Sequence, residues 1–223
     1  MPSVTTLLTD PDGFFGTRTP DPSVKGPIGV IVLIAAVNVV ASIFQFRFTS
    51  QVFESASAGT GVGSGLTTAF QAFSFVFVIA GPFVVWLLYA GVFHAVSLVF
   101  DGDGEFSGTL ALVGWGFLPS VFGSVASAAI NYYRFNVETI EVPAEFTQET
   151  MRQFMHNVNT GPLVALSAAL GIVFTLWSAF LWTFAVKHAR DLRLRNAAIT
   201  VAVPVALGLL VTLRTLFVAL EVL

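Results

Sequence analysis

The sequence predicts an all-α integral membrane protein, a bundle of five transmembrane helices with one short external amphipathic helix. Three observations predict it: 55% of the 223 residues are hydrophobic, only 10% are charged, and the mean hydropathy is +0.83. A soluble domain carries about 25% charged residues, so this chain has too few to cover a water-facing surface. The charged residues also fall in short blocks between uncharged segments, because a charge in hydrocarbon costs several kcal/mol.

Each predicted span is at least about 20 predominantly apolar residues long, as a bilayer requires. The spans are residues 27–46, 70–100, 109–130, 162–186 and 197–220, which together make a membrane domain over residues 27–223 after an arm of residues 1–26. The second span is longer than one untilted helix needs, and Gly81-Pro82 lies inside it as a predicted kink. Pro119 and Pro204 interrupt the third and fifth spans, which predicts bent, packed helices.

The segment 143–157, between the third and fourth spans, predicts the short amphipathic helix. Pro143 suits a helix start, and Phe146, Thr150 and Phe154 recur at four-residue steps. Met151 and Met155 widen the apolar face. Two structural roles fit this pattern, a helix lying on the lipid headgroups and a helix capping the bundle; a functional gate is the less favoured alternative.

Lysines and arginines near the span ends predict the orientation, because they are in excess in cytoplasmic loops. With the N-terminus inside, the inner segments hold six basic residues and the outer ones three; these are Arg18, Lys25, Lys187, Arg190, Arg193 and Arg195 against Arg47, Arg134 and Arg152. We therefore expect a multi-pass protein of the cell membrane with a cytoplasmic N-terminus and an external C-terminus. Two lysines beside eight arginines, with an excess of carboxylates, are typical of a salt-adapted prokaryote.

The turn between the second and third spans holds three carboxylates in five residues, Asp101, Asp103 and Glu105 among two glycines. The sequence from Asp101 begins like the twelve-residue calcium-binding loop of an EF-hand, but its twelfth position is Leu112, where such a loop needs a glutamate. We therefore expect a tight turn with positive φ, and no metal. The basic segment 187–195, with Arg190, Arg193 and Arg195, falls on the same side, and exposed ion pairs with the turn are expected, worth about 0 to 1 kcal/mol each.

Two further residues are candidates for function, His94 in the second span and Arg214 in the fifth. His94 suits a hydrogen bond to a neighbouring helix, and a proton relay is its alternative. Arg214 must pair, snorkel or line a polar cavity, and we expect it to be buried in the bundle. A Ser-His-Asp hydrolase is disfavoured, because only His94 with Asp101 or Asp103 approaches the required set. No catalytic residue, cofactor or metal site is expected.

Several features recur together in this chain: the leader Asp10-Pro11-Asp12-Gly13-Phe14-Phe15, five spans, His94, the glycine-rich turn into Phe106-Ser107, and Gly114-Trp115-Gly116-Phe117-Leu118-Pro119. The chain thereby resembles the Yip-domain family, the Yip-one or Ypt/Rab-interacting proteins, as a prokaryotic member. The resemblance implies a five-helix membrane protein with a cytoplasmic N-terminus. Eukaryotic members associate with small GTPases, but the short acidic arm of this chain argues against such a partner.

Two function classes remain open. The first is a non-enzymatic membrane protein that organises or binds other membrane proteins, further copies of itself or lipids. It is favoured by the resemblance, by small-residue helix faces and by the missing catalytic set. The second is a transporter or permease subunit for a small solute or protons that uses Arg214 and His94, although the five unequal spans show no internal repeat. The lipid bilayer is an expected partner, and nucleic acid is not.

Overall fold

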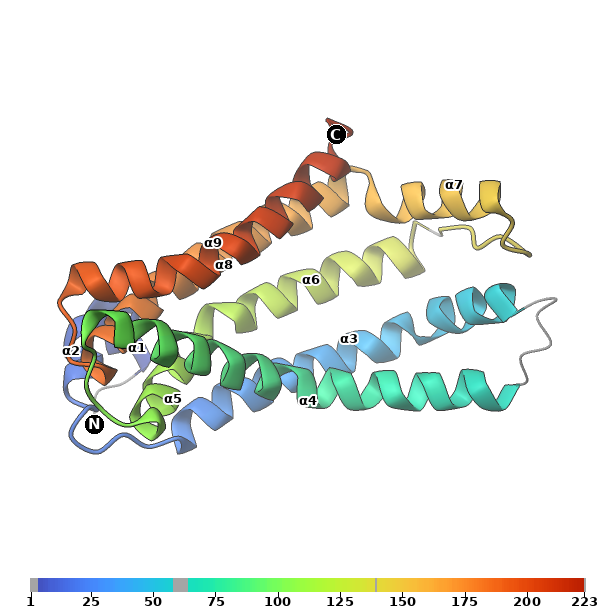
Figure 1. Ribbon diagram of the computed structural model, residues 1–223. Coiled ribbons are helices and arrows are strands. Elements are labelled where there is room, and N and C mark those ends of the chain that lie inside the picture. The colour runs from blue at the N-terminus through green and yellow to red at the C-terminus, as the bar shows by residue number, and fades with distance from the viewer. Residues whose placement is uncertain (1–3, 58–63, 139, 223) are drawn as a thin grey trace. The chain divides into compact units, whose positions relative to one another are not determined.

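The computed structural model describes residues 4–57, 64–138 and 140–222, and this part of the chain is helical without strands (Figure 1). Two short helices open the chain, and a 3₁₀ turn follows the second long helix. In chain order the elements are α1 (Val4–Thr9), α2 (Pro11–Gly16), α3 (Lys25–Ser57), α4 (Ser64–Ser97), η1 (Leu98–Phe100), α5 (Phe106–Trp115), α6 (Leu118–Asn136), α7 (Gln148–Asn159), α8 (Pro162–Ala189) and α9 (Leu194–Ala219).

The predicted all-α membrane fold is confirmed in the described residues. Four helices, α3, α4, α8 and α9, are each long and apolar enough to cross a membrane. Helices α5 and α6 pass the same test together, and a bend of 46° separates them, so they make a fifth span if the pair is one broken span. Helix α3 continues past the predicted end of the first span to Ser57, and α4 runs through Pro82 without ending.

The chain divides into two compact units, and each long span contributes residues to both. The first unit holds residues up to 34, residues 82–122 and residues 172–211. The second holds residues 35–81, 123–171 and 212 onward. Both clusters of buried apolar side chains lie in the first unit, and the two units are described separately.

The first unit is built round the Trp182 side chain of α8, which is 3% exposed. Its ring lies 4.8 Å from that of Tyr89, 5.5 Å from Phe93 and 5.0 Å from Phe117, measured between centroids. Aromatic pairs at such separations contribute about 0.5–1.5 kcal/mol each beyond the area they bury. Two of these partners come from α4 and one from the α5–α6 bend, so Trp182 joins three spans.

The bend between α5 and α6 has a local cause and a tertiary one. Pro119 has no N–H to continue the helix, and the amides of Gly116 and Phe117 bond only three residues back. The indole N–H of Trp182 donates to the carbonyl of Val113 at 3.0 Å, and that of Trp86 donates to Leu110 at 2.9 Å. Both indoles therefore bond to carbonyls of α5, and the prediction that Pro119 bends its span is confirmed.

The N-terminal arm is folded onto the first unit. Leu7 of α1 and Phe14 and Phe15 of α2 have no exposed surface. They pack in one apolar cluster with residues of α5 and α8, namely Leu112, Leu181, Ala185 and Ala189. Helix α2 begins where the Asp10 carboxylate accepts a hydrogen bond from the Gly13 amide at 3.0 Å. This docking was not predicted, because the apolar residues of the arm are few and lie among polar ones without a clear period.

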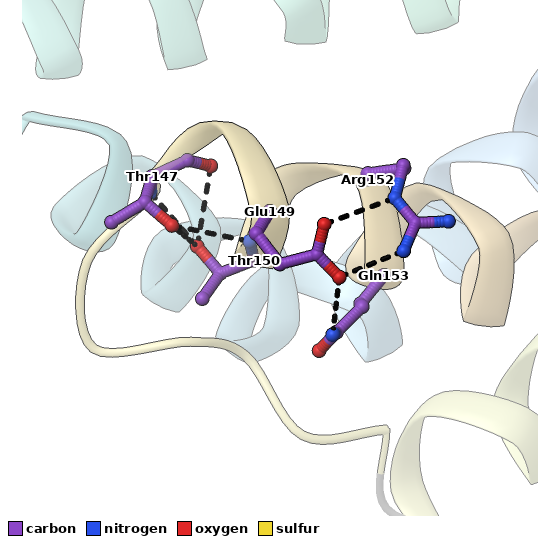
Figure 2. A network of polar contacts seen from close by, with 5 residues as sticks. All are labelled: Thr147, Glu149, Thr150, Arg152 and Gln153. Carbon is purple, nitrogen blue, oxygen red and sulfur yellow. Dashed lines mark hydrogen bonds and ion pairs between the residues drawn. The ribbon is translucent and has the colours of Figure 1, made fainter.

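The second unit contains α7, which confirms the predicted short amphipathic helix but not its predicted start at Pro143. The helix begins at Gln148, because Thr147 and Thr150 satisfy each other's amides (Figure 2). The Thr147 hydroxyl accepts from the Thr150 amide at 3.2 Å, and the Thr150 hydroxyl accepts from the Thr147 amide at 2.8 Å. Pro143 lies in the preceding loop.

The packing of Gly116 yields a stability prediction. A Cβ on Gly116 would overlap the indole of Trp182, so Gly116→Ala should destabilise the protein by about 1–3 kcal/mol, the usual cost of overpacking. The measurement is the thermal midpoint in detergent. Gly29→Ala is the matched control, since nothing lies within 4 Å of its added Cβ and alanine favours the helix by about 0.5–1 kcal/mol. Equal midpoints for the two variants would contradict the packing of Trp182 on Gly116.

Candidate functional site

The acidic turn follows α4 and leads into α5, and its backbone conformation is specific. Asp101 ends η1 with φ at 57°, and Gly104 has φ at 109°. The expected positive φ is therefore present at one glycine and one aspartate; aspartate tolerates this region better than most residues. The Gly102 amide donates to the Ser97 carbonyl at 3.0 Å, which closes the end of α4.

The guanidinium of Arg190, between α8 and α9, lies inside this turn with only 2% of the residue exposed. Its Nε donates to the Ser97 hydroxyl at 2.8 Å, its Nη2 donates to the Gly102 carbonyl at 2.5 Å, and its Nη1 donates to the Gly104 carbonyl. In return the Asp103 amide donates to the Arg190 carbonyl at 3.0 Å. The cation that this turn holds with its backbone oxygens is thus an arginine of the same chain.

The predicted ion pairs between the basic segment and the acidic turn do not form. Arg190 lies beside the turn, but it bonds to backbone carbonyls and a hydroxyl because its fork matches several converging acceptors. The Asp101, Asp103 and Glu105 side chains stay exposed, as do Arg193 and Arg195, and the described residues contain no ion pair between these two sets. The contact is also buried, where the sequence predicted an exposed one.

Two effects act on the charge of Arg190, its burial and its attraction to the Asp103 carboxylate. Burial lowers the pKa of its guanidinium, and the nearby Asp103 carboxylate opposes this shift. An arginine keeps its charge through such shifts, so a cation is held at the turn. Within the described residues no group of three or more histidine and carboxylate side chains is arranged to hold a metal ion.

The N-terminal arm reaches the last turn of α8, next to the α8–α9 connection, through Asp12. Its carboxylate accepts from Lys187 Nζ at 2.5 Å and lies 2.7 Å from His188 Nε2. The Lys187 hydrogen bond, followed by the one to His188, lowers the pKa of Asp12. From the sequence, Asp12 was recognised only as part of the leader motif, and its contacts with Lys187 and His188 were not predicted. Within the first unit, the arm therefore contacts the last turn of α8, and the acidic turn contacts Arg190 just after that helix.

His94 lies on α4 just before this cluster and is half-buried. Its Nδ1 is 3.1 Å from the Thr109 hydroxyl of α5, and its ring meets Phe106 edge-on at 5.5 Å. The neighbouring Ser97, which sequence reasoning also missed, donates its hydroxyl to the His94 carbonyl at 2.6 Å. His94 thus has the hydrogen bond to a neighbouring helix that the sequence suggested.

Arg214 does not occupy the place predicted for it. It is exposed on α9 and not buried, and no hydrogen bond or ion pair of its side chain is found within the described part of the chain. It also lies only five positions before the last residue of α9, Ala219, or about 8 Å along the axis. That distance is within reach of a snorkelling arginine, so burial in the bundle is not needed to keep its charge out of hydrocarbon.

Comparison with known proteins identifies the family. The Yip1 domain matches residues 5–214. The chain belongs to the Yip1 family. An uncharacterized protein of Methanocaldococcus jannaschii is 28% identical over 140 residues, which cover 60% of this chain and 92% of the relative. This archaeal relative supports the prediction that the chain is a prokaryotic member of the family. No solved structure matches the chain.

Arg190 yields a prediction for this Yip1-family protein. Arg190→Lys should destabilise it by about 3 kcal/mol or more. The lysine ammonium lacks the fork of the guanidinium, so it cannot reach the Ser97 hydroxyl and both carbonyls at once, and buried acceptors are left unpaired. The measurement is again the thermal midpoint in detergent. Arg193→Lys is the matched control and should stay within about 0.5 kcal/mol of the wild type, since Arg193 is exposed. A small effect at both positions would mean that Arg190 does not hold the turn.

Proposed function

We propose that this Yip1-family protein is a non-enzymatic membrane protein that binds other membrane proteins or further copies of itself. The binding surface consists of the exposed Asp101, Asp103 and Glu105 with Arg193 and Arg195. The observation that carries the proposal is the placement of Arg190, which fixes the turn from inside while the charged side chains around it remain exposed. A rigid, charged surface at a span end suits recognition of a partner by complementary charge.

The hydrogen bonds near the turn support binding over catalysis. Ser97 and His94 are close, but Ser97 donates to the backbone carbonyl of His94 and accepts from Arg190, and the residue is fully buried. A serine nucleophile would instead need its hydroxyl bonded to the imidazole. The His94 Nδ1 is engaged with Thr109. These contacts support a structural assignment for all three side chains.

The transporter alternative gains nothing from the positions of its two residues. Arg214 is exposed near the end of α9, and His94 is engaged by Thr109. Neither arrangement resembles a polar pathway at mid-membrane, where transporters place their substrate sites. Binding is therefore the function we favour, with lipids as general partners. The short arm is engaged by α8 through Asp12, which leaves less of it for a small GTPase.

Orientation and location belong to the same proposal. The arm contacts the end of α8 through Asp12, and the acidic turn contacts Arg190 just after α8, which supports placing both on one side of the membrane. The excess of lysine and arginine in these segments favours the cytoplasm for that side. The protein is then a cell-membrane protein of a salt-adapted prokaryote, with its C-terminus external.

Cysteine labelling tests this orientation directly, because the chain contains no cysteine. Asp21→Cys and Glu145→Cys are both at exposed positions. In intact cells an impermeant thiol reagent should label Glu145→Cys and leave Asp21→Cys unlabelled. Permeabilised cells, in which both should react, provide the control. Labelling of Asp21→Cys alone in intact cells would reverse the orientation.

The binding surface is tested by removing its negative charge while keeping its shape. Asp101→Asn, Asp103→Asn and Glu105→Gln together should leave the fold intact in detergent, because these side chains are exposed. Membrane proteins that copurify with the wild type should be lost. The matched control makes the same change of charge in another loop, by Glu138→Gln, Glu141→Gln and Glu145→Gln. Identical sets of copurified proteins for the two triple variants would refute the proposed surface.

A further inference from the structure

We propose that α7 carries a lipid-contacting edge, formed by Met151 and Met155, which inserts into the interfacial layer of the bilayer. The two side chains lie one helical turn apart and are 41% and 49% exposed. The contact is apolar and does not depend on lipid charge. This surface belongs to the second unit and is independent of the charged surface proposed above.

The neighbouring edge of α7 is already used to hold the helix. Phe154 is 7% exposed; its ring stacks on Phe48 of α3 at 6.2 Å and meets Phe146 edge-on at 5.3 Å. Phe48 also stacks on Phe135 of α6 at 4.4 Å. The helix is therefore fixed by one apolar edge, and Met151 and Met155 form a second apolar edge that is partly exposed.

Contacts with three span ends fix the height of the last turns of α7. Arg134, in the last turn of α6, donates from Nη2 to the Val158 carbonyl at 2.7 Å. The Gly161 amide, just before α8, donates to the carbonyl of Ala219 at the end of α9 at 3.0 Å. His156 lies 3.6 Å from Glu221, just after α9. The end of α7 thus lies beside the ends of three spans, α6, α8 and α9.

Aromatic side chains mark these span ends as the interface. Tyr132 and Tyr133, beside Arg134, are 45% and 48% exposed. Tyrosines concentrate where a membrane protein passes from hydrocarbon to headgroups. Met155 is adjacent in sequence to Phe154, which packs on the ring of Phe48 in α3. One turn earlier in α3, the ring of Phe44 lies 5.2 Å from that of Tyr132. Met155 therefore lies close to this aromatic layer.

The polar side of α7 is suited to water. Glu149 accepts from Arg152 at 2.7 Å and from Gln153 at 2.7 Å, and Figure 2 shows these three side chains linked on one side of the helix. The Arg152 and Glu149 side chains are 74% and 59% exposed. A helix with a hydrated polar face and an apolar edge at the interface is the arrangement of interfacial amphipathic helices.

Size and charge decide between lipid and other occupants. A stable protein interface buries about 800 Å² on each partner, far more than two methionines supply. A lipid surface needs no such patch. Glu138, Glu141 and Glu145 are exposed in the preceding segment, so an anionic headgroup gains no attraction there. Met151 and Met155 therefore contact the apolar part of the bilayer's interfacial layer, whatever the charge of the lipid headgroups.

The test uses Met155→Cys labelled with an environment-sensitive fluorophore in the full-length protein, reconstituted in phosphatidylcholine vesicles. Arg152→Cys, on the polar side, is the matched control. The Met155 label should be quenched by lipids with brominated acyl chains and be protected from aqueous iodide, and the control should show the reverse. Adding anionic lipid or salt should not change the Met155 result. Circular dichroism must show the wild-type helix content for both variants.

Four outcomes would overturn the inference. Equal iodide quenching of the two labels would place Met155 in water. Protection without quenching by brominated lipid, lost on dilution of protein in the vesicles, would assign the edge to a second copy. Protection that requires anionic lipid would replace apolar insertion by charge pairing. Met151→Cys repeats the measurement one turn away, and a result opposite to that at Met155 would also refute a common lipid-contacting edge.

Discussion

The first unit depends on the burial of one charge. A guanidinium removed from water costs several kcal/mol unless its donors are satisfied, and unsatisfied carbonyls at the end of a helix carry a related cost. Arg190 meets both requirements at once, because its donors reach the Ser97 hydroxyl and the carbonyls of Gly102 and Gly104. The α4–α5 turn and the α8–α9 connection therefore cannot be placed independently. The charged surface proposed for partner binding exists because this contact makes the two loops one structure.

The membrane segment next to this contact uses a different principle. Within hydrocarbon, helices gain little from apolar burial, so close packing and satisfied carbonyls hold them together. Gly114 and Gly116 have no side chain, and the indoles of Trp86 and Trp182 occupy the space that a Cβ would take. Each indole N–H then reaches a carbonyl of α5. Glycine and tryptophan act here as a pair, one providing space and the other filling it with a hydrogen-bond donor.

The sequence predicted the class of fold because composition and the spacing of charges report directly on the solvent. The spans, the bend at Pro119 and the amphipathic α7 follow from residues that act locally. The details of the site were not predictable in that way. Opposite charges predicted that Arg190 would pair with carboxylates, but it donates to backbone carbonyls. Every residue has a backbone carbonyl, so no sequence pattern marks the ones that bind it. Arg214 was expected in the interior because an unpaired guanidinium is costly in hydrocarbon, but it is exposed on α9 five residues before the helix ends, where its side chain can snorkel.

The separation of contacting residues along the chain has a consequence for biosynthesis. Asp12 is made among the first residues, yet its partner Lys187 lies 175 positions later. Val113 is likewise bonded by an indole 69 positions further along. At about 5–20 residues per second, the arm waits for roughly ten seconds or longer before its docking surface exists. During that interval Phe14 and Phe15, fully buried in the finished protein, are available to the lipid surface or to a chaperone.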